Sequence, residues 1–304
     1  MNPVYALPAL RRIRAVRYAR CAEVIVSMPL NDVLALPEEE RVAPLLELAS
    51  SDSQDSEAAQ MVGALLAVLE SGSGDPEQRV AIGELLARYG DPRLNTPADG
   101  EYFVSVPVHQ ETLLVGRFPV TMAEFRAFVN SPRYDDPSNW SEDGLAWKNS
   151  ATDSWTDKID TLEDTLVGAN QPAIFVNWYE AQAYAAASGA RLPSQMERLH
   201  VMRGEAKRPY PWGAPFGSGN ANTAEEVLKR PCAVGLYHRD ATPEGVMDLA
   251  GNVAEWLGDD VAPNRLIHPG SWSQPSMASW AKARFLIAPD FRGPDLGFRL
   301  VRDV

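Results

Sequence analysis

Apolar residues recur at helical spacing through the first third of the chain. Val42, Leu45 and Leu48 follow one another at intervals of three residues, and a first segment around Leu10 and Ile13 has the same spacing. A period of three to four residues is typical of an amphipathic helix. We therefore expect four or five short helices in residues 1–95, which would form a small all-α domain.

Start and stop signals mark several of these helices. Asp32 is expected to cap one helix, and Pro37 stands where the first turn of the next helix would begin. Asp75-Pro76 is expected to open another helix, which Gly90 would end as a C-terminal cap. The polar stretch 50–56 is predicted to be a loop before the apolar run 58–69.

The pattern changes near Gly100. Residues 102–108 alternate like a strand, and residues 112–116 are expected to pair with them as a hairpin. Helices are predicted at 121–129 and 178–187, within long stretches rich in Trp, Gly and Pro. We therefore expect an α+β domain over residues 100–304 with much irregular structure, in which most of the eight tryptophans serve packing.

Charge and composition exclude several classes of partner. The formal net charge is −13, so the phosphates of a nucleic acid would be repelled, whereas a basic partner or a cation would be attracted. Arginines interrupt the opening segment, which argues against a secretory signal, and no apolar run has the length of a membrane span. Cys21 and Cys232 are too few for a disulfide framework. We predict a cytoplasmic bacterial protein without nucleic-acid or membrane partners, and a solvated acidic loop at residues 135–143.

Six sequence blocks follow one another between residues 116 and 300. They are 116–121 with Phe125, 171–181, 191–194 with Glu197 and Arg203, 209–213, 245–256, and 269–272 with 296–300. In this order they resemble the formylglycine-generating enzyme family, also called the sulfatase-modifying factor family. The resemblance implies a C-type lectin-like fold of the formylglycine-generating enzyme type, with two helices, small twisted sheets and much irregular structure.

A structural Ca²⁺ is the cofactor that this resemblance implies. The family's ligand positions correspond here to Asp248, Gly251, Val253 and Glu255, through side chains and backbone carbonyls. Hard oxygen ligands at such close spacing suit calcium. The alternative is that Glu255 and Asn252 only hydrogen-bond the backbone of their own loop.

The oxidase chemistry of the family requires two cysteines between the Gly-Ser-Trp and Gly-Phe-Arg blocks, where they bind copper. In this chain Gln274 and Ser279 occupy those two positions. Neither side chain is a soft ligand for Cu(I), and Cys232 lies well upstream. We therefore expect no formylglycine-generating activity, no catalytic residue of that type and no copper.

A second branch of the family, the sulfoxide synthases of ergothioneine synthesis, joins this domain to a helical domain that carries iron on histidines. The four histidines here are His109, His200, His238 and His268, and none lies in residues 1–100. An iron site of that kind therefore has no ligands in the helical part. We interpret each histidine as a surface or turn residue and expect no iron.

The function that remains is a non-catalytic ligand- or protein-binding module, similar to the variable proteins of diversity-generating retroelements. In those proteins the segment between the same two blocks displays side chains on a stable surface. Trp280 and Phe285 have an alternative interpretation as core residues. The predicted contact residues in this chain are Ser273, Gln274, Ser276, Ser279, Trp280, Lys282, Arg284, Phe291 and Arg292.

Three interpretations of the whole chain are open. The helices at the start of the chain would dock a partner or couple binding to a bacterial signalling, secretion or defence assembly. One alternative is a metal-dependent oxidoreductase of an uncharacterised branch of the same family. Another is an immunity-type protein whose acidic surface blocks a basic effector.

Overall fold

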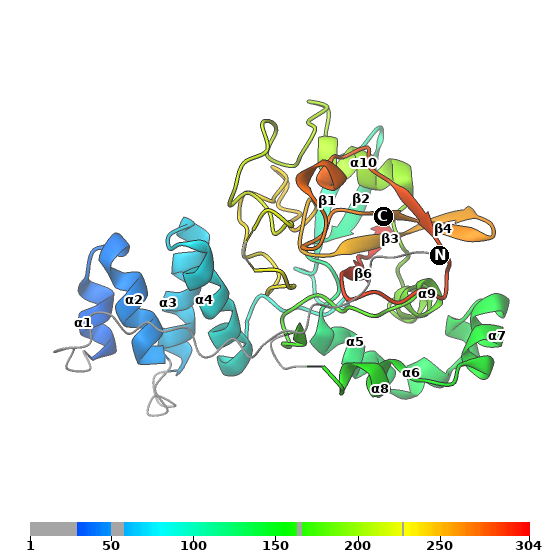
Figure 1. The fold of residues 1–304 in the computed structure, drawn as a ribbon, viewed down its shortest axis with the longest axis horizontal. Helices are drawn as coiled ribbons and strands as arrows, with labels where there is room; N and C mark the ends of the chain where they lie inside the picture. Colours follow the sequence, from blue (N-terminus) through cyan, green and yellow to red (C-terminus); the bar gives the residue numbers. More distant parts are fainter. Residues whose placement is uncertain (1–28, 50–57, 163–165, 227) are drawn as a thin grey trace.

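The computed structural model describes residues 29–49, 58–162, 166–226 and 228–304. Four helices lie in a row beside a larger part that holds both sheets and the remaining helices (Figure 1). The predicted first helical segment around Leu10 and Ile13, Cys21 and the predicted loop 50–56 lie outside the described residues.

The row consists of α1 (Leu30–Ala35), α2 (Glu38–Ala49), α3 (Ala58–Ser71) and α4 (Pro76–Tyr89). The predicted start of α4 is confirmed, because Asp75 and Gln78 form a reciprocal capping box, and Gly90 ends the helix. The prediction that Asp32 caps a helix is wrong. Pro29 precedes α1 in an extended conformation and Leu30 is already buried, so the helix begins earlier and Asp32 falls in its first turn.

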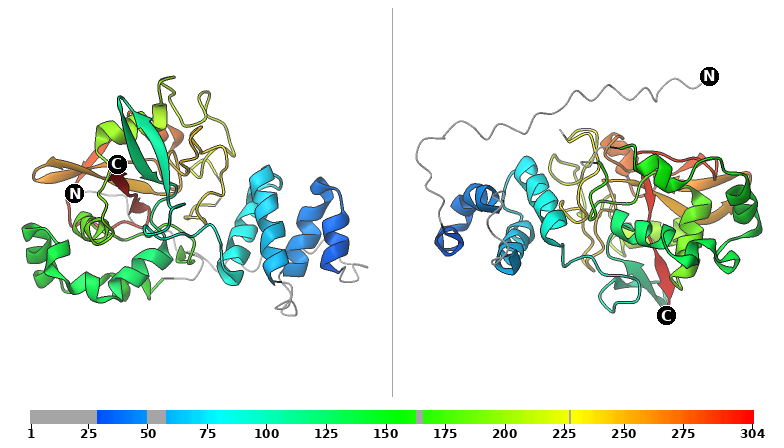
Figure 2. Two further views of the ribbon diagram at one scale, coloured as in Figure 1. Left: turned by 180° about the vertical axis from the view of Figure 1, so that it is seen from behind. Right: turned by 90° about the horizontal axis from the view of Figure 1, so that it is seen from below.

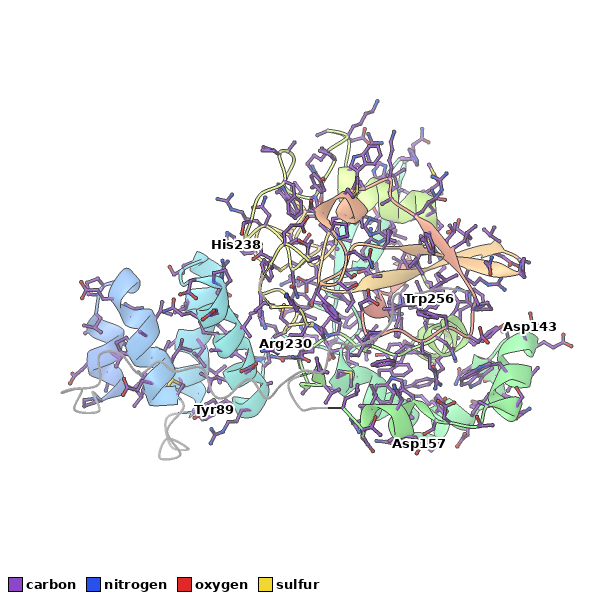
Figure 3. The ribbon with its side chains drawn as sticks, viewed as in Figure 1. Tyr89, Asp143, Asp157, Arg230, His238 and Trp256 are labelled. Atoms are coloured by element: carbon purple, nitrogen blue, oxygen red, sulfur yellow. The ribbon has the colours of Figure 1, made fainter. Side chains whose placement is uncertain are left out.

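The helices share their apolar core with a loop of the larger part. Cys232, Ala233, Leu236 and Tyr237 pack into the same cluster as the buried leucines of α2, α3 and α4. Arg230 and His238, at the two ends of this loop, lie between α4 and the larger part (Figure 3). The division at residues 95–100 stays a prediction, and the packing described here crosses it.

Two small sheets form the framework of the larger part. The first contains β1 (Phe103–Val108), β2 (Glu111–Gly116) and β7 (Val301–Asp303) in that order, so the predicted hairpin is confirmed. The second has the order β5 (Phe285–Ile287), β4 (Asn264–His268), β3 (Ala254–Val261) and β6 (Leu296–Phe298). The strands of β3 and β6 run parallel and the other neighbours antiparallel. In the first sheet, β2 pairs with β7, so residues from the start of this part and residues near 301–303 lie side by side.

Helices cover the sheets on several sides (Figures 1 and 2). The predicted helices appear as α5 (Met122–Val129) and α9 (Trp178–Ala187), each with a capping box. The segment predicted as an acidic loop instead forms α6 (Pro132–Asp135), the 3₁₀ turn η2 (Pro137–Asn139) and α7 (Glu142–Ser150), because Asp136 and Ser141 cap the following turns. The remaining helices are α8 (Trp155–Ile159) and α10 (Gln195–Arg203).

Aromatic side chains fill the core between the second sheet and these helices. Phe125 packs edge-to-face on Trp155 and Phe298. Trp256, at the centre of the larger part (Figure 3), is fully buried and donates from its indole nitrogen to the carbonyl of Val176. The packing role predicted for most tryptophans is confirmed, and so is the fold class, an α+β domain of formylglycine-generating enzyme type preceded by helices.

Within the described ranges, none of the helices combines the length and the apolar character that crossing a membrane requires.

Candidate functional site

A fully buried carboxylate lies at the centre of the larger part. Glu255 on β3 is held by two guanidinium groups: Arg198 Nε lies 2.8 Å from Oε2, and Arg299 Nη2 lies 2.9 Å from Oε1. Arg198 comes from α10 and Arg299 directly follows β6, so the cluster joins three distant segments. Although burial opposes ionisation, Arg299 and Arg198 hold the pKa of Glu255 below its ordinary value.

The same two guanidinium groups also donate hydrogen bonds to carbonyl oxygens of the loop before β3. Arg299 donates to the carbonyls of Met247 and Asp248, and Arg198 donates to that of Leu249. Charge-assisted bonds of this kind are stronger than neutral ones. Two side-chain cations thus satisfy one carboxylate and three carbonyl oxygens around this loop.

Two further carboxyl groups are buried beside the loop. Asp240 accepts hydrogen bonds from the backbone N–H groups of residues 249–251, and Asp248 accepts one from Gly235. Burial raises the pKa of Asp240 to about 8, with the neighbouring Asp248 charge adding to the effect, and burial raises the pKa of Asp248 to about 6. These groups anchor the loop through backbone donors.

The predicted calcium ligands Asp248, Gly251, Val253 and Glu255 do not fit Ca²⁺ in this arrangement. Calcium needs several oxygen atoms that face the ion, and both oxygens of Glu255 already face guanidinium groups. A divalent cation would enter against two positive charges on the same carboxylate. Among the residues that the structure describes, there is also no group of three His, Cys, Asp or Glu side chains arranged to hold a metal.

The two positions of the family's cysteines lie in different surroundings. Gln274 is half-buried and donates from its amide to Ser273 Oγ. Ser279 ends the 3₁₀ turn η4 (Ser276–Ser279), is fully buried, and has no hydrogen-bond partner for its Oγ among the described residues. Cys232 donates its backbone N–H to Asn252, and burial raises the pKa of its thiol. None of the three positions presents a thiolate to solvent.

Two of the four histidines, His109 and His200, are neighbours, and His238 and His268 lie in other segments of the larger part. The rings of His109 and His200 lie 5.1 Å apart, and His200 Nε2 is 3.0 Å from the carbonyl oxygen of Pro107. His238 is exposed, as expected for a turn residue. His268 departs from the surface interpretation: it is buried, and burial lowers the pKa of its ring well below the ordinary value.

The predicted contact residues fall into two groups in space. Trp280, Lys282 and Arg284 are exposed, and Lys282 Nζ lies 5.8 Å from the centre of the Trp280 ring. Phe291 and Arg292 follow β5, and the Arg292 guanidinium reaches α7 and α9, where it covers Trp147 and pairs with Glu180. The structure therefore assembles the first three into one surface and leaves Arg292 outside it.

Four of the predicted contact residues form contacts within the fold or are buried. Arg292 forms an ion pair of 2.6 Å with the buried carboxylate of Glu180, so its charge is already compensated. Ser279 is fully buried, and Ser273 is half-buried and donates to Asp295. Ser276 donates its backbone N–H to Glu225. These residues are therefore less available to a partner than Trp280, Lys282 and Arg284.

A groove of about 240 Å³ lies beside the exposed group, between α10 and residues 281–284. Met196, which is 64% exposed, lines this groove. Trp280 (47% exposed) and Phe285 (61%) flank residues 281–284 in the sequence, and Met277 (75%) and Leu286 (44%) are exposed in the same segment of the chain. The sequence indicated neither Met196 nor Met277 nor Leu286. Met196 is a single apolar residue within a capped helix, and only the placement of α10 against residues 281–284 makes it part of this surface.

The family model of the sulfatase-modifying factor enzyme 1-like domain matches residues 75–304. The chain belongs to this family. The match begins at the N-cap of α4, so this last helix of the row falls within the family's domain. Three family blocks, 191–203, 245–256 and 296–300, bring Arg198, Glu255 and Arg299 together, so these blocks contribute the central ion pairs of the fold.

Several proteins are similar to this member of the sulfatase-modifying factor family. The hercynine oxygenase of Mycolicibacterium thermoresistibile is 31% identical over 241 residues, which cover 67% of this chain and 52% of that protein. The inactive C-alpha-formylglycine-generating enzyme 2 of Mus musculus is 27% identical over 60% of this chain and 72% of that protein. The chain spans about half the length of the hercynine oxygenases that it matches. Among solved structures, Treponema denticola variable protein 1 matches with a TM-score of 0.48 and 17% identity, over 66% of this chain and 95% of that one.

Proposed function

We propose that this protein is a binding module on a formylglycine-generating-enzyme-like scaffold and that its segment 273–295 contacts a protein partner. One observation carries the proposal: of the eight large hydrophobic side chains exposed in the described residues, the five at 277, 280, 285, 286 and 291 lie in this segment. Such a concentration of apolar surface is characteristic of interaction sites, and tryptophan is enriched among residues that dominate binding.

The residues at the family's catalytic positions support a role without oxidase chemistry. Gln274 supplies an amide and Ser279 a buried hydroxyl, and neither forms the thiolate that holds Cu(I). The mouse relative carries the word inactive in its name. We extend the same interpretation to this chain, within a bacterial signalling, secretion or defence assembly to which the helices would connect it.

A protein–protein test uses the exposed segment directly. The chain is co-expressed with the products of neighbouring genes, and complexes are measured by size-exclusion chromatography. Replacing Phe285 by Glu places a charge in the apolar surface and is expected to abolish the complex. Val261→Glu, a matched change at another exposed apolar residue of the same sheet, is expected to leave it intact. A complex that survives Phe285→Glu, or the lack of any complex, would contradict the proposal.

A metal-dependent oxidoreductase is the second candidate, and the similarity to hercynine oxygenases favours it. Metal analysis of the purified protein separates the two functions. Stoichiometric copper or iron would exclude the purely binding role, whereas metal-free protein that retains its partner would support it.

A further inference from the structure

We infer that the groove between α10 and residues 281–284 receives an extended segment of the partner, in which an apolar side chain is flanked by carboxylates. This inference rests on the proposed function and names the chemistry of its partner. The groove adds α10, which lies outside the segment 273–295 on which the proposed function was argued.

The groove is lined by apolar side chains together with the buried Arg198 and His268. Leu257 and Ala281 are buried there, and Leu199 is half-buried. The backbone of the 281–284 wall is fixed, because Ala281 donates its N–H to Pro209 and Ala283 donates to Trp280. The volume of about 240 Å³ is below the roughly 300–1,000 Å³ of pockets for drug-sized ligands. The groove therefore suits one or two apolar side chains of a peptide.

The charge at the rim is opposite to that of the whole chain. Lys282 and Arg284 are exposed at the groove, and neither has a carboxylate partner among the described residues. The acidic side chains near the other wall are engaged: Glu197 pairs with Arg191, and Asp259 accepts the N–H of Gln195. In a chain of net charge −13, this local positive rim selects a partner segment that carries carboxylates.

The rim also offers adaptable apolar contact and a free strand edge. Met196 is exposed on α10 and lines the groove, and the flexible thioether of methionine adapts to different partners. Beyond Arg284 the chain continues as β5, which among the described residues pairs only with β4. Alternate backbone groups of β5 therefore face away from the sheet, where an extended peptide can add as a strand beside Phe285 and Leu286.

The test uses two synthetic peptides of opposite charge. The first is a fluorescein-labelled Asp-Glu-Leu-Phe-Glu-Asp peptide, and the second has lysine at its four acidic positions. Binding to the full chain is followed by fluorescence anisotropy at low and at high salt. We expect the acidic peptide to bind at least about tenfold more tightly than the basic one, with an advantage that falls as salt rises. Equal binding of both peptides, or no binding of the acidic peptide, would overturn the inference.

Variants locate the peptide on the groove. The double change Lys282→Glu and Arg284→Glu is expected to weaken binding of the acidic peptide about tenfold or more, and Ala283→Trp is expected to block the groove. A control with the same change of net charge, Lys207→Glu and Arg239→Glu, alters two exposed cations elsewhere. Binding that responds equally to the control and to the rim variant would place the peptide outside the groove and contradict the assignment.

The same variants separate this inference from the proposed function. If the complex with a co-expressed partner is lost on Phe285→Glu but unaffected by the double rim change and by Ala283→Trp, the binding module stands and the acidic-peptide groove falls. If neither formation of the complex nor binding of the peptide is changed by Phe285→Glu or by the rim variants, both proposals are wrong. Thermal unfolding of each variant confirms that the fold is retained before either comparison is made.

Discussion

Glu255 shows how a single buried charge organises this domain. Its carboxylate is fully buried and paired with Arg198 and Arg299, each of which also donates to backbone carbonyls. Removing one member of such a group leaves an uncompensated charge in the interior, which costs more than the pair contributes. The stability of the domain therefore depends on three residues that a sequence pattern presents as unrelated.

Replacing Glu255 by Gln is expected to lower the free energy of unfolding by about 3–5 kcal/mol, because two guanidinium groups lose their counter-charge. Arg198→Met is expected to cost less, since Arg299 still faces the carboxylate. Urea unfolding measures both variants. Glu244→Gln, at an exposed position, serves as the control and is expected to stay within about 0.5 kcal/mol of the parent protein. A Glu255→Gln variant with the same free energy of unfolding as the parent protein would refute the interpretation.

Calcium is expected to have no effect on the unfolding temperature of the parent protein. The two guanidinium groups occupy both oxygens of Glu255, so the ion gains too few ligands. A bound ion at about one hundred times its Kd would add about 2.7 kcal/mol of stability, which thermal unfolding detects readily. Thermal scans in millimolar CaCl₂ and in EDTA make the comparison. A saturable increase with CaCl₂ would restore the sequence-based calcium prediction.

Glu124 is expected to make the protein less stable as pH rises from 4 to 7. Burial raises its pKa in the folded protein from 4.5 to about 6, so the folded state binds the proton more tightly than the unfolded chain. This contribution is fully present below pH 4.5, is lost as pH rises through 6, and amounts to about 2 kcal/mol. Glu124→Gln should make the profile of unfolding free energy against pH less steep by this contribution, while those of Asp248 and Asp240 stay. Glu101→Gln, at an exposed position, should leave the profile unchanged.

At the scale of elements, helix α4 joins the other helices of the row to the larger part. A Cβ on Gly83 would lie 2.8 Å from the Cβ of Ala233, whereas nothing lies within 4 Å of a Cβ on Gly63 of α3. The absence of a side chain at Gly83 therefore allows close packing, while Gly63 only weakens its helix.

Two glycine replacements test this coupling. Gly63→Ala is expected to raise the free energy of unfolding by about 0.5–1 kcal/mol through helix propensity alone. Gly83→Leu is expected to lower it by about 1–3 kcal/mol, because the side chain overlaps Ala233 and Leu236. Guanidinium unfolding of the two variants gives the comparison, and a stabilising Gly83→Leu would exclude close packing at this position.

Sequence signals predicted those elements whose start or pairing depends on residues close together in the chain. The Asp75-Pro76 signal predicted the start of α4, and alternation predicted the hairpin β1–β2. The helices of the segment 132–150 were missed because their turns are short and bury little apolar surface. The exposure of Trp280 and Phe285 was open for the same kind of reason: a strand pattern does not say which sheet edge lacks a neighbour.

At the scale of the whole molecule, the candidate site depends on contacts between distant segments. The resemblance predicted the family and the fold, which the family match confirms. It did not predict that Arg198 would reach Glu255, nor that Met196 would stand beside residues 281–284, since both depend on how α10 docks. Pairings over such separations are set by tertiary packing, which residue types alone do not specify.

Cys232 reports whether the helices stay docked. It is buried in the core shared by the helices and residues 232–237, and burial raises the pKa of its thiol. In a Cys21→Ser background we expect a thiol reagent to label Cys232 at least about a hundredfold more slowly in the native protein than in urea. A fragment of residues 96–304 should lose this protection. Equal protection in the fragment would support independent folding at the predicted boundary.

Strands β6 and β7 close both sheets, and Arg299 lies between them. During synthesis, β2 and β3 emerge from the ribosome without these partners, and Glu255 has only Arg198 as a counter-charge until Arg299 is made. The larger part can therefore reach its native state only after residue 303 has left the ribosomal tunnel. Chaperones that shield the unpaired strands in this interval would then govern how much of the protein is recovered in folded form.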